Sequence, residues 1–239
     1  MPRFFADYNG GEIITLSPED SKHVAKALRM KTGEKLTVCD GLGTDYECEV
    51  DNISPDSVSV KVILQKPSET EADVDITIYQ ALPKSDKMDG IIQRAVELGA
   101  KKIVPILTER CVSRPDAKAC DTKVRRWNKI ALEAAMQCGR GMIPQVEAVQ
   151  SFRQAIGSMT ADTVIMFYEG GGKPSREMDI KKGQSVAVII GPEGGFERSE
   201  VDFALASGAV IGSLGPRILR TQTASLAATA AIMFMTENM

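Results

Sequence analysis

Three glycine-bearing loops are the segments whose residue types could bind a ligand. They run from Phe167 to Gly172, from Gly191 to Phe196 and from Leu214 to Arg220, and each follows a predicted strand. Glycine lets the backbone approach a ligand because no Cβ stands in the way. In an open α/β sheet, ligands bind outside the carboxyl ends of the strands. One such loop could be a simple turn, but three together predict a shared pocket.

The second loop does not match the common nucleotide-binding fingerprints. A dinucleotide site needs G-x-G-x-x-G between the first strand and the first helix, whereas residues 191–195 read G-x-x-G-G and lie late in the chain. The Walker pattern of phosphate-binding loops does not occur in the sequence. A nicotinamide-dependent oxidoreductase is therefore the weaker interpretation.

Histidine and cysteine usage excludes further classes of site. His23 is the only histidine, which argues against a histidine-based triad and against a multi-histidine metal site. The five cysteines are odd in number and never reach the CxxC spacing of zinc or redox sites. We expect no metal, and a reducing cytoplasm is the compartment that fits best.

Composition predicts an ordinary globular protein without indicating a function. The 239 residues are 43% hydrophobic and 26% charged, with a net charge of −3. Between residues 101 and 140, however, ten Lys/Arg face four Asp/Glu, a local excess of +6 that indicates either an anionic partner or a solvated helix face. The longest apolar run, Ala224 to Met235, is too short for a bilayer span of about 20 residues. We expect neither secretion nor membrane insertion.

The chain divides into a small β-rich domain and a larger α/β domain. The polar segment Lys66 to Asp73 contains proline and predicts a linker, which gives domains at residues 1–70 and 74–239. In the first domain, Ser17-Pro18 predicts the start of a helix that ends near Met30. Alternating apolar and polar residues predict strands at 12–17, 35–39, 46–53 and 58–64.

In the second domain, strands alternate with helices. The pattern predicts strands at 76–82, 103–107, 163–168, 185–190 and 210–214, and helices at 87–98, 122–138, 152–156, 200–206 and 221–235. Such alternation is typical of a mostly parallel sheet covered on both faces. The continuous apolar run from Val186 to Ile190 predicts a strand that is buried on both sides.

Two sequence segments carry a family resemblance. IIGPEGGFERSEV at 189–201 and SLGPRILRTQTA at 213–224 together resemble the paired signature of the RsmE family of 16S rRNA (uracil-N3) methyltransferases. HVAKALRM at 23–30 and KSDKMDGIIQRAVELG at 84–99 extend the similarity over nearly the whole chain. The resemblance implies a SPOUT-type, mostly parallel α/β sheet with a C-terminal trefoil knot, preceded by a small β-barrel PUA-like RNA-binding domain. Periodicity alone does not reveal the knot.

The resemblance also implies a cofactor and partners. Proteins of this family are homodimers that use S-adenosyl-L-methionine to methylate 16S rRNA of the small ribosomal subunit, so we expect the same of this chain. The residues that this similarity assigns to cofactor binding all lie in or beside the three loops: Phe167, Tyr168, Glu169, Ile190, Gly191, Glu193, Gly194, Leu214, Gly215, Ile218 and Leu219.

The implied substrate atom, uracil N3, carries a proton, so a base or a cationic group must assist. We predict that Arg220 and Arg217 stabilise the anion, because a guanidinium stays charged and can fork onto a carbonyl. Glu193 is a candidate proton acceptor, with a loop carboxylate bonded to nearby amides as the equal alternative. The family usually has Glu where this chain has Gln222, so no carboxylate can act as a base at that position.

A target uridine must be unpaired before N3 can react, so basic side chains should guide a single strand. The candidates are Arg3, Arg29, Lys31, Lys84, Lys87, Arg114 and Arg140, each of which could also be a plain surface charge. Two alternative functions also involve RNA but differ in their chemistry. One is a non-catalytic RNA-binding or ribosome-assembly protein, and the other is a SPOUT RNA methyltransferase with a different target base.

Overall fold

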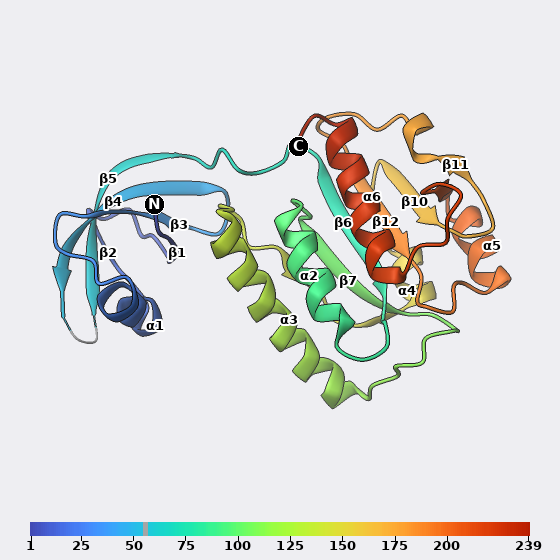
Figure 1. Ribbon diagram of the computed structural model, residues 1–239, viewed down its shortest axis with the longest axis horizontal. Helices are drawn as coiled ribbons and strands as arrows, with labels where there is room; N and C mark the ends of the chain where they lie inside the picture. Colours follow the sequence, from blue (N-terminus) through green and yellow to red (C-terminus); the bar gives the residue numbers. More distant parts are fainter. Residues whose placement is uncertain (55–56) are drawn as a thin grey trace. The chain divides into compact units, whose positions relative to one another are not determined.

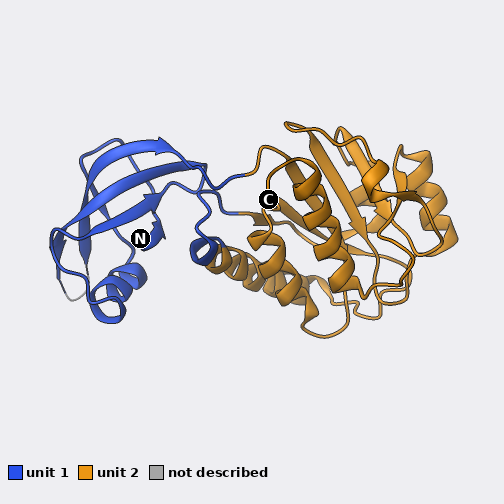
Figure 2. Cartoon of the chain, turned by 45° about the horizontal axis from the view of Figure 1, so that its top comes forward, with its two compact units in different colours: residues 1–71, 135–143 blue, residues 72–134, 144–239 orange. Residues whose placement is uncertain are grey.

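The computed structural model describes residues 1–54 and 57–239, which form two compact units (Figure 2). Unit 1 comprises residues 1–71 and 135–143, and unit 2 comprises residues 72–134 and 144–239. The return of residues 135–143 to unit 1 has no counterpart in the boundaries expected from the sequence, which assigned all of 74–239 to one domain.

Unit 1 is built on a five-stranded sheet in the order β1-β3-β4-β5-β2. Its strands are β1 (Arg3–Phe5), β2 (Ile13–Thr15), β3 (Lys35–Cys39), β4 (Thr44–Ile53) and β5 (Val58–Pro67). The pairs are antiparallel except for β1 with β3, and two register shifts interrupt β4 against β5. Alternate residues such as Leu36, Val38 and Val60 fill a core from one face.

The single helix predicted after Ser17 is two short segments, α1 (Pro18–Lys22) and a π-helical turn η1 (His23–Ala27). The Ser17 hydroxyl oxygen accepts from the backbone N–H of Asp20 at 3.1 Å, as an N-cap should. The segment ends before Met30 because Arg29 adopts a φ of 52°, in the left-handed region that interrupts a helix.

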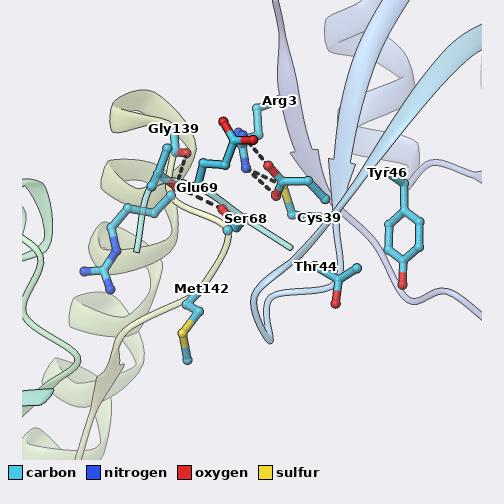
Figure 3. A network of polar contacts seen from close by, with 12 residues as sticks. Arg3, Cys39, Thr44, Tyr46, Ser68, Glu69, Gly139 and Met142 are labelled. Atoms are coloured by element: carbon cyan, nitrogen blue, oxygen red, sulfur yellow. Dashed lines mark hydrogen bonds and ion pairs between the residues drawn. The ribbon is translucent and has the colours of Figure 1, made fainter. Parts of the chain in front are cut away.

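Arg3 is part of the internal polar network of unit 1 (Figure 3). Its guanidinium donates to both carboxylate oxygens of Asp45 at 2.8 Å and to Cys39 Sγ at 2.8 Å. Burial raises the pKa of the Cys39 thiol to about 12, so this sulfur stays protonated. The Arg3 side chain is only 15% exposed and is held by a buried carboxylate, while its expected contact with RNA stays a prediction.

Arg140 is likewise an internal residue of unit 1. Its side chain is 5% exposed and pairs with Glu71 at 2.6 Å, while Glu71 also accepts from the backbone N–H groups of Gly141 and Met142. The guanidinium is therefore held in this internal pair, and its expected role as an RNA contact stays a prediction.

The segment predicted as a linker is bonded into unit 1 over most of its length. Lys66 and Pro67 complete β5, and Ser68 donates its backbone N–H to the carbonyl of Gly43 at 2.8 Å. The Thr70 hydroxyl donates to the carbonyl of Gly139 at 2.9 Å and lies 3.0 Å from the Ser68 hydroxyl. Polarity and proline predicted a tether, but here the polar atoms make specific hydrogen bonds.

Unit 2 is built on an eight-stranded sheet in the order β11-β13-β10-β12-β6-β7-β8, with β9 also paired to β7. Every strand pair that the structure describes in it is parallel, which confirms the predicted sheet type. The strands are β6 (Asp75–Ala81), β7 (Lys102–Leu107), β8 (Gln145–Val146), β9 (Gln150–Ser151), β10 (Thr163–Phe167), β11 (Lys173–Pro174), β12 (Ser185–Ile190) and β13 (Val210–Ser213).

Helices cover both faces of this sheet. They are α2 (Lys87–Glu97), α3 (Ala117–Cys138), α4 (Phe152–Gly157), a 3-10 turn η2 (Ser175–Glu177), α5 (Arg198–Ala206) and α6 (Thr221–Met235). Figure 1 shows α2 and α6 side by side against the strands, and α4 packs on α5. Since Val186 to Ile190 are all at most 2% exposed, β12 is buried on both sides as predicted.

Two helices begin earlier than their apolar pattern suggested. α3 starts at Ala117 because the Asp116 carboxylate accepts from the backbone N–H of Ala119 at 2.8 Å, in the manner of an N-cap. α5 starts at Arg198 because Glu197 and Glu200 form a reciprocal capping box. Trp127 of α3 lies in the core as expected, at 3% exposure.

Within residues 1–54 and 57–239, no helix combines the length and apolarity that a membrane span requires. The same described part holds no cluster of three or more His, Cys, Asp or Glu side chains placed to bind a metal ion.

The Glu71–Arg140 pair gives a stability prediction. Replacing Glu71 with alanine removes the carboxylate that a buried guanidinium and two backbone N–H groups share, so Glu71→Ala should lower the free energy of unfolding by about 3 kcal/mol. Urea denaturation followed by circular dichroism measures the change. The matched control is Glu69→Ala, whose side chain is 82% exposed and should cost less than about 0.5 kcal/mol. Equal effects of the two variants would contradict this account.

Candidate functional site

The three glycine-bearing loops line one cavity of about 850 Å³ at the carboxyl ends of β10, β12 and β13. The register explains why they meet: Phe167 at the end of β10 pairs with Ile190 at the end of β12 and with Gly212 of β13. All the residues predicted to bind a cofactor line this cavity. Residues that sequence reasoning did not assign also line it: Gly171, Pro192, Gly195, Phe196, Ser213, Pro216, Thr221 and Ala224.

Glycines let the first and second loops pack directly on one another. A Cβ on Gly195, which has a φ of 70°, would collide with the Glu169 carboxylate, and one on Gly191 would lie 2.9 Å from the Phe196 ring. These glycines are therefore required for loop packing, whether or not a ligand also approaches their backbone.

Arg110, to which the sequence analysis gave no role, ties the second loop to the start of α5. Its Nε donates to Glu197 at 2.8 Å, and its terminal nitrogen donates to the carbonyl of Gly194 at 3.0 Å. The hydrogen bond from Arg110 lowers the pKa of the Glu197 carboxyl and so keeps the pair ionised. Only long-range structure reveals this contact, because 84 residues separate Arg110 from Gly194.

Glu193 is held by the first residue of α2 and by the segment that precedes this helix. It accepts from Lys87 Nζ at 2.6 Å and from the backbone N–H of Lys84 at 3.2 Å. Partial burial alone would raise the pKa of this carboxyl, but the hydrogen bonds from Lys87 and from backbone N–H groups outweigh it and hold the pKa below its usual value of 4.5. A carboxylate so stabilised is a poor proton acceptor, which favours the bonded-loop alternative over the catalytic one.

Arg217 and Arg220 line the cavity with exposed side chains. Neither guanidinium has a hydrogen bond or ion pair with another of the described residues, in contrast to Arg110. Two permanent positive charges are thus available to a bound anion or carbonyl oxygen. Gln222 does not line the cavity.

Comparisons with known proteins agree with this geometry. The family model for an RNA methyltransferase domain matches residues 70–233, and the model for an RNA methyltransferase PUA domain matches residues 16–63. Ribosomal RNA small subunit methyltransferase E of Bacillus subtilis is 35% identical over 250 aligned positions, covering 99% of this chain and 98% of that protein. The chain belongs to the ribosomal RNA small subunit methyltransferase E family.

Other members of this methyltransferase E family are similar along their whole length. The Mycobacterium tuberculosis protein is 30% identical, with 95% of this chain and 88% of the relative covered. A crystal structure from Neisseria gonorrhoeae, described as bound to S-adenosyl methionine, superposes with a TM-score of 0.90 at 28% identity and covers 99% of this chain and 98% of that one. The family resemblance and the expected α/β fold with a PUA-like first domain are confirmed, while the trefoil knot stays a prediction.

The remaining basic candidates of this family member differ in availability. Arg29, Lys31 and Lys84 have exposed side chains. Lys87 is engaged with Glu193, and Arg114 donates to the carbonyls of Thr108 and Glu109 at 2.9 and 2.8 Å. Lys87 and Arg114 thus also contact loop segments, and a role in guiding RNA stays a prediction for all five residues.

The Lys87–Glu193 ion pair predicts a pH effect. A carboxyl whose pKa is lowered on folding adds stability that is present above its unfolded pKa and is lost as the pH falls. Lys87→Met should reduce the loss of stability between about pH 6 and pH 3 by less than about 1 kcal/mol, because the pair is partly exposed. The melting temperature of this variant should therefore fall less steeply over this range. Differential scanning fluorimetry across this range measures it.

Lys84→Met is the control for this experiment, since Lys84 reaches Glu193 through its backbone N–H and not through its side chain. It should keep the wild-type pH profile. If Lys84→Met and Lys87→Met gave the same profile, the ion pair would not be the source of the shift.

Proposed function

We propose that this chain transfers the methyl group of S-adenosyl-L-methionine to N3 of a uridine in 16S rRNA. The cavity formed by the three loops carries the proposal, because a member of the same family is described as bound to S-adenosyl methionine and every residue expected to bind this cofactor lines the cavity here. The expected localisation in the cytoplasm, the small ribosomal subunit as partner and a homodimeric state belong to the same proposal.

The cavity suits an adenosyl ligand in size and chemistry. About 850 Å³ lies within the range of small-molecule sites, which combine apolar walls with a few polar groups. Leu214, Ile218 and Leu219 supply apolar contacts, and the loop backbones around Gly191 and Gly194 supply hydrogen-bonding groups without side chains in the way. When bound, the sulfonium group supplies the electrophilic methyl, so the chain itself has mainly to orient two reactants.

The chain assists the nucleophile through charge. Arg220 and Arg217 can each donate to a uracil carbonyl oxygen, which stabilises the negative charge left on the ring when the N3 proton passes to solvent water. Glu193 is a weak acceptor because its pKa is held low, and Gln222 has no charge. Electrostatic stabilisation by the two arginines is thus the assistance that the site offers.

Of the two arginines, Arg220 should give the more sensitive test of this chemistry, because it directly precedes α6. Arg220→Ala should lower kcat by roughly 100-fold or more, the usual loss when one oxyanion-stabilising donor is removed, while the Kd for S-adenosyl-L-methionine changes by less than about 3-fold. Transfer of labelled methyl groups to 30S subunits and isothermal titration measure the two quantities. Arg198→Ala, an exposed arginine outside the cavity, is the control. Unchanged turnover in Arg220→Ala rejects the charge-stabilising role.

The substrate itself can be identified in cells. Nucleosides from 16S rRNA of a strain lacking this protein should miss one N3-methylated uridine by mass spectrometry, and the wild-type chain but not Arg220→Ala should restore it. A binding or assembly protein without catalytic activity predicts unchanged nucleosides. A different methylated base missing from the deletion strain would retain the enzyme class and correct the target.

A further inference from the structure

Gln80 is a buried amide on the central part of the sheet, one position before the end of β6. It is 0% exposed and pairs in register with Ile190 of β12 on one side and with Pro105 of β7 on the other. The residue after Ile190 is Gly191, where the second loop of the cavity begins. Gln80 does not itself line the cavity.

A chain of hydrogen bonds leads from Gln80 to that loop. Gln80 Nε2 donates to the carbonyl of Ala81 at 3.0 Å and to Thr221 Oγ1 at 2.9 Å, and Thr221 Oγ1 donates to the carbonyl of Gly191 at 2.6 Å. The Ala81 carbonyl can only accept, and the one hydroxyl proton of Thr221 is used on Gly191. Only the NH₂ group of Gln80 can face these two acceptors, so its orientation is fixed.

This orientation leaves the other half of the amide unsatisfied. Gln80 Oε1 is buried and has no hydrogen-bond partner among the described residues. Buried polar atoms without partners oppose folding, so an apolar side chain of the same size would suit this core position at least as well for stability. The amide is therefore better explained by what it orients than by what it stabilises.

We propose that Gln80 is a positioning residue for cofactor binding, acting through Thr221 on the Gly191 loop. Thr221 is the first residue of α6 and directly follows Arg220, so this single hydroxyl joins the second loop of the cavity to the end of the third. By donating to Thr221 Oγ1, Gln80 fixes the direction of that hydroxyl. The proposal rests on the proposed function, since it names S-adenosyl-L-methionine as the ligand whose site is positioned.

The test separates binding from folding. Gln80→Met keeps the approximate volume and removes the donor, so the Kd for S-adenosyl-L-methionine by isothermal titration should rise roughly 10-fold, the effect of one hydrogen bond, with an unchanged or higher melting temperature without ligand. Turnover on 30S subunits should show a raised KM for S-adenosyl-L-methionine with a smaller change in kcat.

Variants of α6 complete the experiment. Thr221→Val should weaken binding to a similar degree, the double variant should be no worse than either single one, and Thr221→Ser, which keeps the hydroxyl, should restore binding. Thr229→Val is the matched control: among the described residues, its buried hydroxyl on the same helix bonds only to the Ser225 carbonyl, and the Kd of this variant should equal the wild-type value.

The outcomes are distinct. Wild-type protein that fails to bind S-adenosyl-L-methionine overturns the proposed function. Wild-type binding with equal affinity in Gln80→Met overturns the positioning role alone, as does a Gln80→Met protein that loses its melting transition, because Gln80 would then be needed for folding. Fully additive effects of Gln80→Met and Thr221→Val would show that the two residues act separately.

Discussion

The burial of β12 on both of its faces is the constraint on which the site depends. The side chains from Val186 to Ile190 point alternately to the two faces of the sheet and all are buried, so a shift of the strand by one position would disturb two cores at once. Parallel pairing then aligns the carboxyl ends of β10, β12 and β13. The loops that follow these strands therefore begin at the same edge of the sheet, and together they form the cavity.

Alignment alone does not shape the loops, and long-range polar contacts do this instead. Arg110 holds the carbonyl of Gly194, Lys87 holds Glu193, and Thr221 holds the carbonyl of Gly191. Each anchor comes from a different element and uses a donor against a loop acceptor. The second loop of the cavity is thus oriented by the rest of the unit, and such preorganisation lowers the entropic cost of binding a ligand.

The sequence predicted those parts of the fold in which local pattern and burial agree. The apolar run of β12 and the alanine-rich α6 were predicted with their observed bounds, Ser185–Ile190 and Thr221–Met235. The polar starts of α3 and α5 were missed, because the cap at Asp116 and the capping box of Glu197 with Glu200 lie outside any apolar period.

The composition of the cavity was predictable because glycine-rich turns after strands are a local signal. Partners of charged side chains were not, since sequence spacing says nothing about a contact between residues 42 or 69 positions apart. Arg3 with Asp45 and Arg140 with Glu71 are therefore internal pairs that a list of basic residues could only present as surface charges. Neither the periodicity of the sequence nor the order of the strands reveals the predicted knot.

The helix α3 contributes to both compact units: its residues up to Ala134 belong to unit 2, while Ala135–Ile143 complete unit 1. Of the eight strands of the second sheet, only β6 and β7 precede residue 143 in the chain. During synthesis the first unit therefore acquires the arginine partner of Glu71 only after part of the second unit has been made. No single proteolytic cut between residues 71 and 135 would release an intact amino-terminal piece.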